Sequence, residues 1–214
     1  MLTKLTIAKT HTAAGTTNPL SVLNTEIANC DKCPGMNIPG ETQSAPGYGS
    51  PTSPIMLVGQ SLCGPCMETG IPFTGGSGRL IDAALTVAGR RKDEIFTTNV
   101  VHCHPPDNQP SEPAWIANCA DYLRREFAVV RPWLIVGLGE DARTAIRAEY
   151  PNSPALEWWP FIAPAHPTTD GPALLFLPHP RWVMTRPAHL REAWVVGLAS
   201  AINWAFRGPT VETA

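Results

Sequence analysis

Four of the six cysteines in this sequence fall into two pairs that lie far apart along the chain. Cys30 and Cys33 are separated by two residues, whereas Cys103 and Cys119 are separated by a proline-rich run and the expected first turns of a helix. Four thiolates from two such segments can surround one soft metal centre. Any fold that does this must bring residues near the start of the chain against residues beyond its middle.

The cysteine spacing favours an iron–sulfur cluster over zinc. A Cys-x-x-Cys pair is the usual zinc signature, but zinc folds usually take their second pair from an equally tight turn. A disulfide framework is the alternative, and it fits poorly with a 214-residue chain whose first residues, Met1 to Lys4, lack the apolar run of a secretion signal. We therefore expect a reducing, cytoplasmic setting.

Length and composition predict a single domain over residues 1–214, with residues 1–20 and 208–214 flexible. Hydrophobic residues make up 43% of the chain, which is enough for a substantial core. The sequence has no long uninterrupted apolar segment, which argues against a membrane span. The 23 prolines lie mainly between the apolar runs, which predicts stiff loops. A net charge of −2 gives no overall basic field, so any contact with nucleic acid must be local, through Arg90-Arg91-Lys92 or through Arg181 with Arg186. Taken alone, such short basic runs indicate only a solvated face.

Short apolar runs alternate with longer helical segments along the chain. The runs end at Gly, Pro or polar residues, as buried parallel strands do. We therefore expect an α/β fold, a three-layer α/β/α sandwich with a central, mostly parallel four-stranded sheet and functional loops at the carboxyl ends of its strands. The expected strands are residues 55–59, 95–101, 133–138 and 173–177, and the expected helices are residues 78–88, 112–129, 140–149 and 187–206.

Polar motifs follow three of these expected strands. They are residues 59–66 (GQSLCGPC) with 70–80 (GIPFTGGSGRL), residues 98–106 (TNVVHCHPP), and residues 179–181 (HPR). In this order they resemble the uracil-DNA glycosylase superfamily, and most closely its family 4, the iron–sulfur branch. The resemblance runs from about Cys30 to the last expected helix, and residues 98–106 with the two cysteine pairs are its most specific part.

The resemblance implies a DNA glycosylase, which flips a base out of DNA and hydrolyses its N-glycosidic bond. Phe73 and Asn99 match the residues that stack on and read the base, and His179 matches a donor to the departing base. Taken singly, these three residues would be read as a core aromatic, a turn former and a loop histidine. Further implied roles are catalysis for Gln60 and Ser61, DNA contacts for Gly75, Gly76, Ser77, Gly78, Arg181 and Arg186, and ligation of a 4Fe-4S cluster for Cys30, Cys33, Cys103 and Cys119. The implied partner is single- or double-stranded DNA, bound by a monomer away from any membrane.

Two departures from the family pattern point to a changed substrate. Gln60 and Ser61 stand where family 4 has its acidic loop residue, and Glu68 is a distant substitute. Arg181 and Trp182 follow His179-Pro180, where the family has small or aliphatic residues. We expect the substrate to be a modified pyrimidine, such as glucosylated 5-hydroxymethylcytosine of phage DNA, which would place the protein in antiviral defence. The alternative is a uracil-DNA glycosylase of base-excision repair.

Two further alternatives remain. The run Cys63-Gly64-Pro65-Cys66 also occurs in thioredoxin-like oxidoreductases, where it opens a helix. The glycines and proline that follow closely leave no room for that helix, so we expect Cys63 and Cys66 to be free. A non-catalytic DNA-binding relative is the other alternative, because the missing acid could mean lost chemistry. The presence of Phe73, Asn99 and His179 argues against it, since binding alone needs no base pocket.

Overall fold

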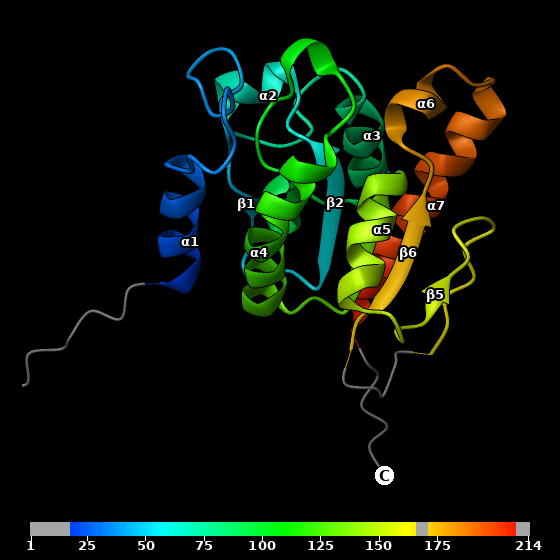
Figure 1. Cartoon of the computed structure of the whole chain (residues 1–214). Coiled ribbons are helices and arrows are strands. Elements are labelled where there is room, and N and C mark those ends of the chain that lie inside the picture. Colours follow the sequence, from blue (N-terminus) through cyan, green and yellow to red (C-terminus); the bar gives the residue numbers. More distant parts are fainter. Residues whose placement is uncertain (1–17, 166–170, 209–214) are drawn as a thin grey trace, which may run out of the picture.

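A central sheet covered by helices on both faces makes up the computed structural model, which describes residues 18–165 and 171–208 (Figure 1). Within these residues the sheet has six strands in the order β1-β3-β2-β4-β6-β5, and not the four that we expected. The four expected strands are its parallel centre: β3 (Phe96–Val101), β2 (Ile55–Ser61), β4 (Leu134–Leu138) and β6 (Ala173–Leu177). The additional edge strands are β1 (Tyr48–Gly49), antiparallel to β3, and β5 (Ala155–Leu156), parallel to β6.

Five helices form the two outer layers of the described residues (Figure 1). One face of the sheet packs against α1 (Pro19–Ala28), α4 (Pro113–Val130) and α5 (Glu140–Glu149), and the other against α3 (Gly78–Ala88) and α7 (Ala188–Arg207). The bounds of α3 and α5 agree with the expected ones. No helix among the described residues is long and apolar enough to cross a membrane.

The central strands are buried on both faces, which explains their nearly continuous apolar sequences. Helix α3 shows the complementary pattern, with Ile81, Ala84 and Leu85 facing the core at helical spacing. It ends at Gly89, which has a left-handed backbone with φ of 67°. Helix α3 follows β2 and α2 in the chain, so its start lies at the edge of the sheet where the strands have their carboxyl ends.

Helix α1 occupies part of a segment that we expected to be loop or flexible. Residues 1–17 lie outside the described residues, but Asn18 caps the helix by accepting a hydrogen bond from the backbone N–H of Leu20. Leu23 and Ile27 on its inner face are buried. The helix therefore carries Cys30, which follows it closely, to the side of the sheet covered by α4.

A buried polar cluster joins α4 to β3. The Glu126 carboxylate accepts hydrogen bonds from the Thr98 hydroxyl at 2.7 Å and the Gly47 amide at 3.0 Å, and it lies 3.3 Å from Nε2 of His102. Although burial disfavours the charged form of His102, the Glu126 carboxylate raises the pKa of this imidazole to about 10. The cluster fixes β3 immediately beside Asn99.

Two short helices lie at the carboxyl edge of the sheet: α2 (Gly64–Thr69) follows β2, and α6 (Pro180–Met184) follows β6 (Figure 1). Two 3-10 turns complete the described elements, at Lys92–Glu94 and Pro106–Asn108. The first leads into β3 and the second follows it. This edge therefore gathers the segments in which the sequence places its polar motifs.

Candidate active site

A pocket of about 530 Å³ opens at the carboxyl edge of the sheet, between the segments that follow β2, β3 and β6. Nine of the residues singled out from the sequence line it: Gln60, Ser61, Phe73, Gly75, Gly76, Ser77, Gly78, His179 and Arg181. Asn99, Arg186 and the four widely spaced cysteines do not line it. The fold thus brings three separate motifs into one concave site.

At the inner end of this site, two neighbouring strands and an aromatic ring approach one another closely. Gly59 of β2 pairs in register with Asn99 of β3. A Cβ atom on Gly59 would lie 2.5 Å from Oδ1 of Asn99 and 2.6 Å from Cζ of Phe73, so only glycine leaves room there. The ring of Phe73 and the amide of Asn99 therefore both lie close to Gly59.

Asn99 is buried, with 3% of its surface exposed, and its Oδ1 atom has no hydrogen-bond partner among the described residues. A buried carbonyl oxygen without a partner costs about 1–3 kcal/mol. Such an atom is uncommon in a folded protein and marks a place where a ligand can supply the missing donor. Asn99 therefore presents an unused acceptor beside Phe73, although its side chain does not form part of the pocket wall.

Phe73 adopts a left-handed backbone conformation, with φ of 60°. This conformation is unfavourable for a residue with a side chain, so the surroundings must hold it. Gly78 is part of that holding structure, because a Cβ there would lie 1.9 Å from the carbonyl oxygen of Phe73. The start of α3 thus packs directly against the backbone that aims the aromatic ring.

His179 caps helix α6. Its Nδ1 atom accepts a hydrogen bond from the backbone N–H of Arg181 at 3.2 Å, which leaves the ring proton of a neutral imidazole on Nε2. Burial lowers the pKa of His179 below its ordinary value, and the Arg181 guanidinium lowers it further against a smaller opposing effect of Asp141. The side chain that lines the pocket is therefore a neutral N–H donor.

Gln60 is positioned by Ser111, whose hydroxyl oxygen lies 3.5 Å from its Nε2. With Nε2 engaged in this way, Oε1 of Gln60 remains an acceptor. Glu68 lies on α2 with an exposed side chain and is not part of the pocket wall. None of the residues described as lining the pocket is Asp or Glu.

Asn108 and Gln109 also line the pocket, and sequence reasoning did not single them out. Asp107 and Asn108 both have φ of 54°, and these left-handed residues turn the chain back after the two prolines. The available signal was the Asp-Asn pair after Pro105-Pro106, which is typical of such a turn. The two amides add polar groups to the pocket lining.

The glycine-rich segment, Arg181 and Arg186 lie in three different environments. Gly75 and Gly76 have φ of 65° and 46° and precede the start of α3, where Ser77 occupies the cap position. Arg181 is exposed at the pocket, whereas the Arg186 guanidinium lies over the ring of Trp182, 4.1 Å from its centroid. Trp182 itself is half exposed on α6. Arg181 therefore places an exposed cation at the pocket, and the next residue, Trp182, exposes part of its ring without lining the pocket.

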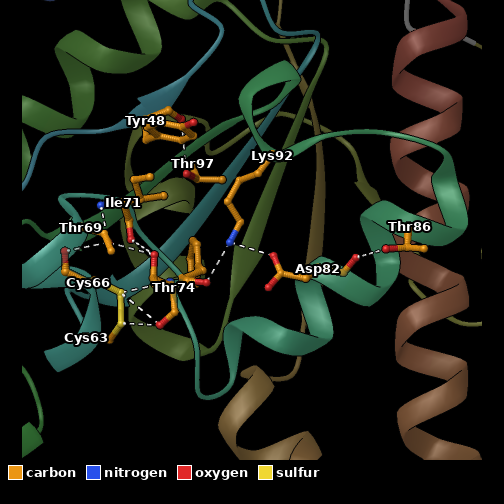
Figure 2. A network of polar contacts seen from close by, with 11 residues as sticks. Tyr48, Cys63, Cys66, Thr69, Ile71, Thr74, Asp82, Thr86, Lys92 and Thr97 are labelled. Carbon is orange, nitrogen blue, oxygen red and sulfur yellow. Dashed lines mark hydrogen bonds and ion pairs between the residues drawn. A yellow bond between two sulfur atoms is a disulfide. The ribbon is translucent and has the colours of Figure 1, made fainter.

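Two expectations about Cys63 and Cys66 are wrong. The pair forms a disulfide rather than two free thiols, and the six-residue helix α2 starts immediately after Cys63. The helix fits because it ends early, at Gly70 in the left-handed conformation with φ of 68°. Sγ of Cys66 accepts a hydrogen bond from the backbone N–H of Thr74 at 3.3 Å, as Figure 2 shows. The disulfide therefore anchors the segment next to Phe73.

The other four cysteines, Cys30, Cys33, Cys103 and Cys119, are free and belong to the core cluster formed with α1 and α4. Burial raises the pKa of the Cys103 thiol to about 12, and the nearby sulfurs of Cys119, Cys30 and Cys33 add to this rise. Although burial opposes it, the adjacent His102 imidazole holds the pKa of Cys119 below its ordinary value. The four sulfurs are thus close enough to influence one another, although they come from both halves of the chain.

One side-chain amide donates to a sulfur of this group, and a cation lies nearby. The side-chain amide of Asn118 donates to Sγ of Cys33 at 3.3 Å, and the Lys32 ammonium lies 4.0 Å from the centroid of the Tyr122 ring beside them. In the described part of the chain, no group of three His, Cys, Asp or Glu side chains is arranged to hold a single metal ion. The donor set is nevertheless four soft sulfur ligands with neighbouring N–H groups, which suits iron–sulfur chemistry.

Comparison with known proteins agrees with this geometry. The family model of the uracil DNA glycosylase superfamily matches residues 46–198, which include the whole pocket. A type-4 uracil-DNA glycosylase of Pyrobaculum aerophilum is 35% identical over 120 residues, covering 56% of this chain and 60% of that protein. One of Archaeoglobus fulgidus is 35% identical over 117 residues, covering 55% and 58%. A type-5 uracil-DNA glycosylase of Pyrobaculum aerophilum is 27% identical over 169 residues, covering 65% and 73%.

The alignments to the two type-4 proteins span less than two thirds of their lengths, whereas the family model spans most of this chain. The family model begins before β1 and ends within α7, so it takes in all six strands of the sheet. It also takes in both strand ends at which Gly59 and Asn99 meet. The chain belongs to the uracil DNA glycosylase superfamily.

Proposed function

We propose that this protein is a DNA glycosylase that binds a flipped pyrimidine in the pocket at the carboxyl edge of the sheet and hydrolyses its N-glycosidic bond. The observation that carries the proposal is the unpaired, buried Oδ1 of Asn99 beside the ring of Phe73. A pyrimidine offers a flat face for the ring and an N–H group on its edge for this acceptor. The names of the matching relatives, type-4 and type-5 uracil-DNA glycosylases, support the same reaction class.

His179 supplies the main catalytic interaction in this proposal. When the bond between the base nitrogen and C1′ of the sugar breaks, the electron pair leaves with the base and negative charge gathers on its carbonyl oxygen. A neutral imidazole with its proton on Nε2 donates a hydrogen bond to that oxygen. The low pKa of His179 favours this form, because burial and Arg181 both oppose a charged ring.

Gln60 positions water in the second half of the reaction. Its Oε1 accepts a hydrogen bond from a water molecule, whose oxygen then bonds to C1′ of the sugar cation. The proton released from the water neutralises the departed base, so the products are the free base and an abasic site. An amide orients water without removing its proton, which is sufficient when bond breaking precedes attack.

The rim of the pocket holds the DNA strand on either side of the flipped nucleotide. Gly75, Gly76 and Ser77 bring backbone N–H groups to the start of α3, where a phosphate is favoured, and Gly78 closes this turn by donating its own N–H to the Gly75 carbonyl oxygen at 2.8 Å. Arg181 adds a charge at the opposite rim, and the exposed Trp182 offers a surface for an unstacked base. The Arg186 guanidinium packs over the Trp182 ring and helps to hold the ring in position.

The substrate that this pocket favours is a modified pyrimidine, such as glucosylated 5-hydroxymethylcytosine of phage DNA, and the corresponding role is antiviral defence. Gln60, Ser61, Asn108 and Gln109 line the pocket with amides and a hydroxyl and without a carboxylate. Such groups hydrogen-bond readily to a sugar or hydroxymethyl substituent. Uracil excision in base-excision repair is the second candidate, and the names of the relatives favour it.

Oligonucleotides that carry one altered base test both candidates. The protein is incubated with single- and double-stranded DNA containing uracil, 5-hydroxymethylcytosine or its glucosylated form, and abasic sites are then cleaved with alkali. We expect strong cleavage with a modified cytosine and weak cleavage with uracil. Robust uracil excision without activity on modified cytosines would assign the protein to repair, and no release from any of these substrates would refute the glycosylase proposal.

Cys30, Cys33, Cys103 and Cys119 are the residues that would hold a 4Fe-4S cluster. Their free thiols, mutual influence and neighbouring N–H donors support this assignment. The cluster would act structurally, by joining the segment after α1 to the end of β3 and to α4. These cysteines lie outside the pocket wall, so their own part in catalysis is to fix the segments that carry Asn99.

We expect the purified protein to be brown and to bind four irons through these cysteines. Thiolate-bound iron gives broad visible absorption, whereas zinc gives none. Changing Cys103 to Ser should remove the absorption and the iron, while the matched change Cys63→Ser should leave both intact. Metal analysis that finds zinc without iron, or iron loss in Cys63→Ser, would contradict the assignment.

A further inference from the structure

Lys92 makes two contacts that connect the entry to β3 with the backbone of Phe73. Its ammonium donates a hydrogen bond to the Phe73 carbonyl oxygen at 3.0 Å and lies 2.8 Å from Oδ1 of Asp82 on α3. Figure 2 shows the Lys92 side chain reaching toward Asp82, with its nitrogen between two oxygen partners. About one fifth of the side chain is exposed, so this ammonium is largely withdrawn from water.

These contacts act on the one residue of the pocket that combines an aromatic ring with an unfavourable backbone. Phe73 has φ of 60°, and its carbonyl oxygen is also packed against Gly78. Rotation of the Phe73 backbone toward an ordinary conformation would move both the carbonyl group and the ring. A charged donor on the carbonyl oxygen opposes that rotation, and Asp82 keeps the donor in place.

We propose that Lys92 is a positioning residue for base binding, which holds the Phe73 ring against Gly59 and Asn99 by fixing the Phe73 carbonyl group. This inference rests on the proposed function, because it assigns to Phe73 the surface on which the flipped base stacks. Lys92 does not line the pocket and touches no substrate. Its effect on excision therefore passes through the residues that it contacts, Phe73 directly and Asp82 as the group that keeps the ammonium in place.

The neighbouring residue offers a matched control. Arg91 forms an ion pair with Asp93 in the same turn, with distances of 3.0 and 3.1 Å, but the described contacts of its guanidinium do not include Phe73. Its side chain is 75% exposed. Lys92→Met and Arg91→Met each remove one cation and one ion pair from this turn, and only the first removes the hydrogen bond to the Phe73 carbonyl.

Excision kinetics give the first test, with the oligonucleotide that the wild-type protein cleaves best. Lys92→Met should lower kcat/KM by about 10- to 100-fold, the size expected when a reacting group is displaced slightly. Arg91→Met should leave kcat/KM unchanged. In a Phe73→Leu background, which keeps an apolar side chain, Lys92→Met should cost less than about threefold, because the ring that it positions is already gone. Equal losses in both backgrounds would overturn the inference.

Hydrogen–deuterium exchange tests the same inference without requiring activity. Lys92→Met should speed amide exchange in residues 73–78 and leave β4 and α5 unchanged, whereas Arg91→Met should change neither region. If the wild-type protein releases no base from any substrate, the proposed function fails, and the exchange result still decides whether Lys92 holds this segment. Unchanged exchange in residues 73–78 would refute the positioning role.

Discussion

Replacing Asn99 with alanine is expected to abolish base excision while leaving the fold intact. The Oδ1 atom of Asn99 is buried and has no partner among the described residues, so it is available to the edge of a bound base. A site built around such hydrogen bonds discriminates by a factor on the order of 10⁴, because its buried polar groups go unpaired with the wrong partner. The measurement is single-turnover cleavage of the best oligonucleotide substrate, followed by alkali and gel analysis.

The control for this variant is Asn108→Ala, which removes an amide that lines the pocket wall itself. Asn108 lies on a loop, so its loss should reduce the rate much less and should affect a modified base more than uracil. Thermal unfolding and visible absorption should be unchanged in Asn99→Ala, because the Oδ1 atom of Asn99 has no hydrogen-bond partner to lose among the described residues. Normal cleavage by Asn99→Ala would remove this residue from the site.

Replacing His179 with alanine is expected to slow excision by roughly 100- to 1000-fold, which is the usual cost of losing one well-placed donor to a developing oxyanion. The hydrogen bond from the Arg181 backbone fixes Nδ1 of His179 as an acceptor, so Nε2 carries the donated proton. His179→Ala removes that donor without touching Phe73 or Asn99. The rate of base release at saturating enzyme measures the loss directly.

Gln60→Ala is the comparison that separates the two halves of the reaction. Gln60 orients water through an amide, whereas His179 stabilises charge on the departing base. The loss in Gln60→Ala should therefore be smaller than in His179→Ala. A larger loss in Gln60→Ala would mean that water activation, and not departure of the base, limits the reaction.

The sequence predicted the central elements of this fold well because their signals are long and regular. Helices α3 and α5 have the expected bounds, since apolar residues repeat at helical spacing between clear start and stop residues. The edge strands β1 and β5 were missed because two residues are too short to show any alternation. Helix α2 was missed because its six residues end at a glycine that also reads as part of a loop.

The site was predicted only in part, because the spacing of residues in the sequence does not show how a loop turns or how cysteines pair. Gln60 and His179 were found because the motifs that contain them resemble those of the uracil-DNA glycosylase superfamily, and parallel strands bring these motifs to one edge of the sheet. Gln109 was missed because two consecutive left-handed residues turn its loop back over the pocket. The spacing of Cys63 and Cys66 permits a disulfide, a metal knuckle or free thiols, so sequence could not choose among them.

The close approach of both Phe73 and Asn99 to Gly59 also limits how substrate preference in this lineage can evolve. No residue larger than glycine fits at position 59 without moving the aromatic ring, the amide or both. Single mutations at position 59 therefore have little scope to adjust the pocket gradually. Drift toward a new base must begin at other pocket residues, such as Gln60 near the end of β2 and Asn108 after β3, where one exchange can be tolerated before the next arrives.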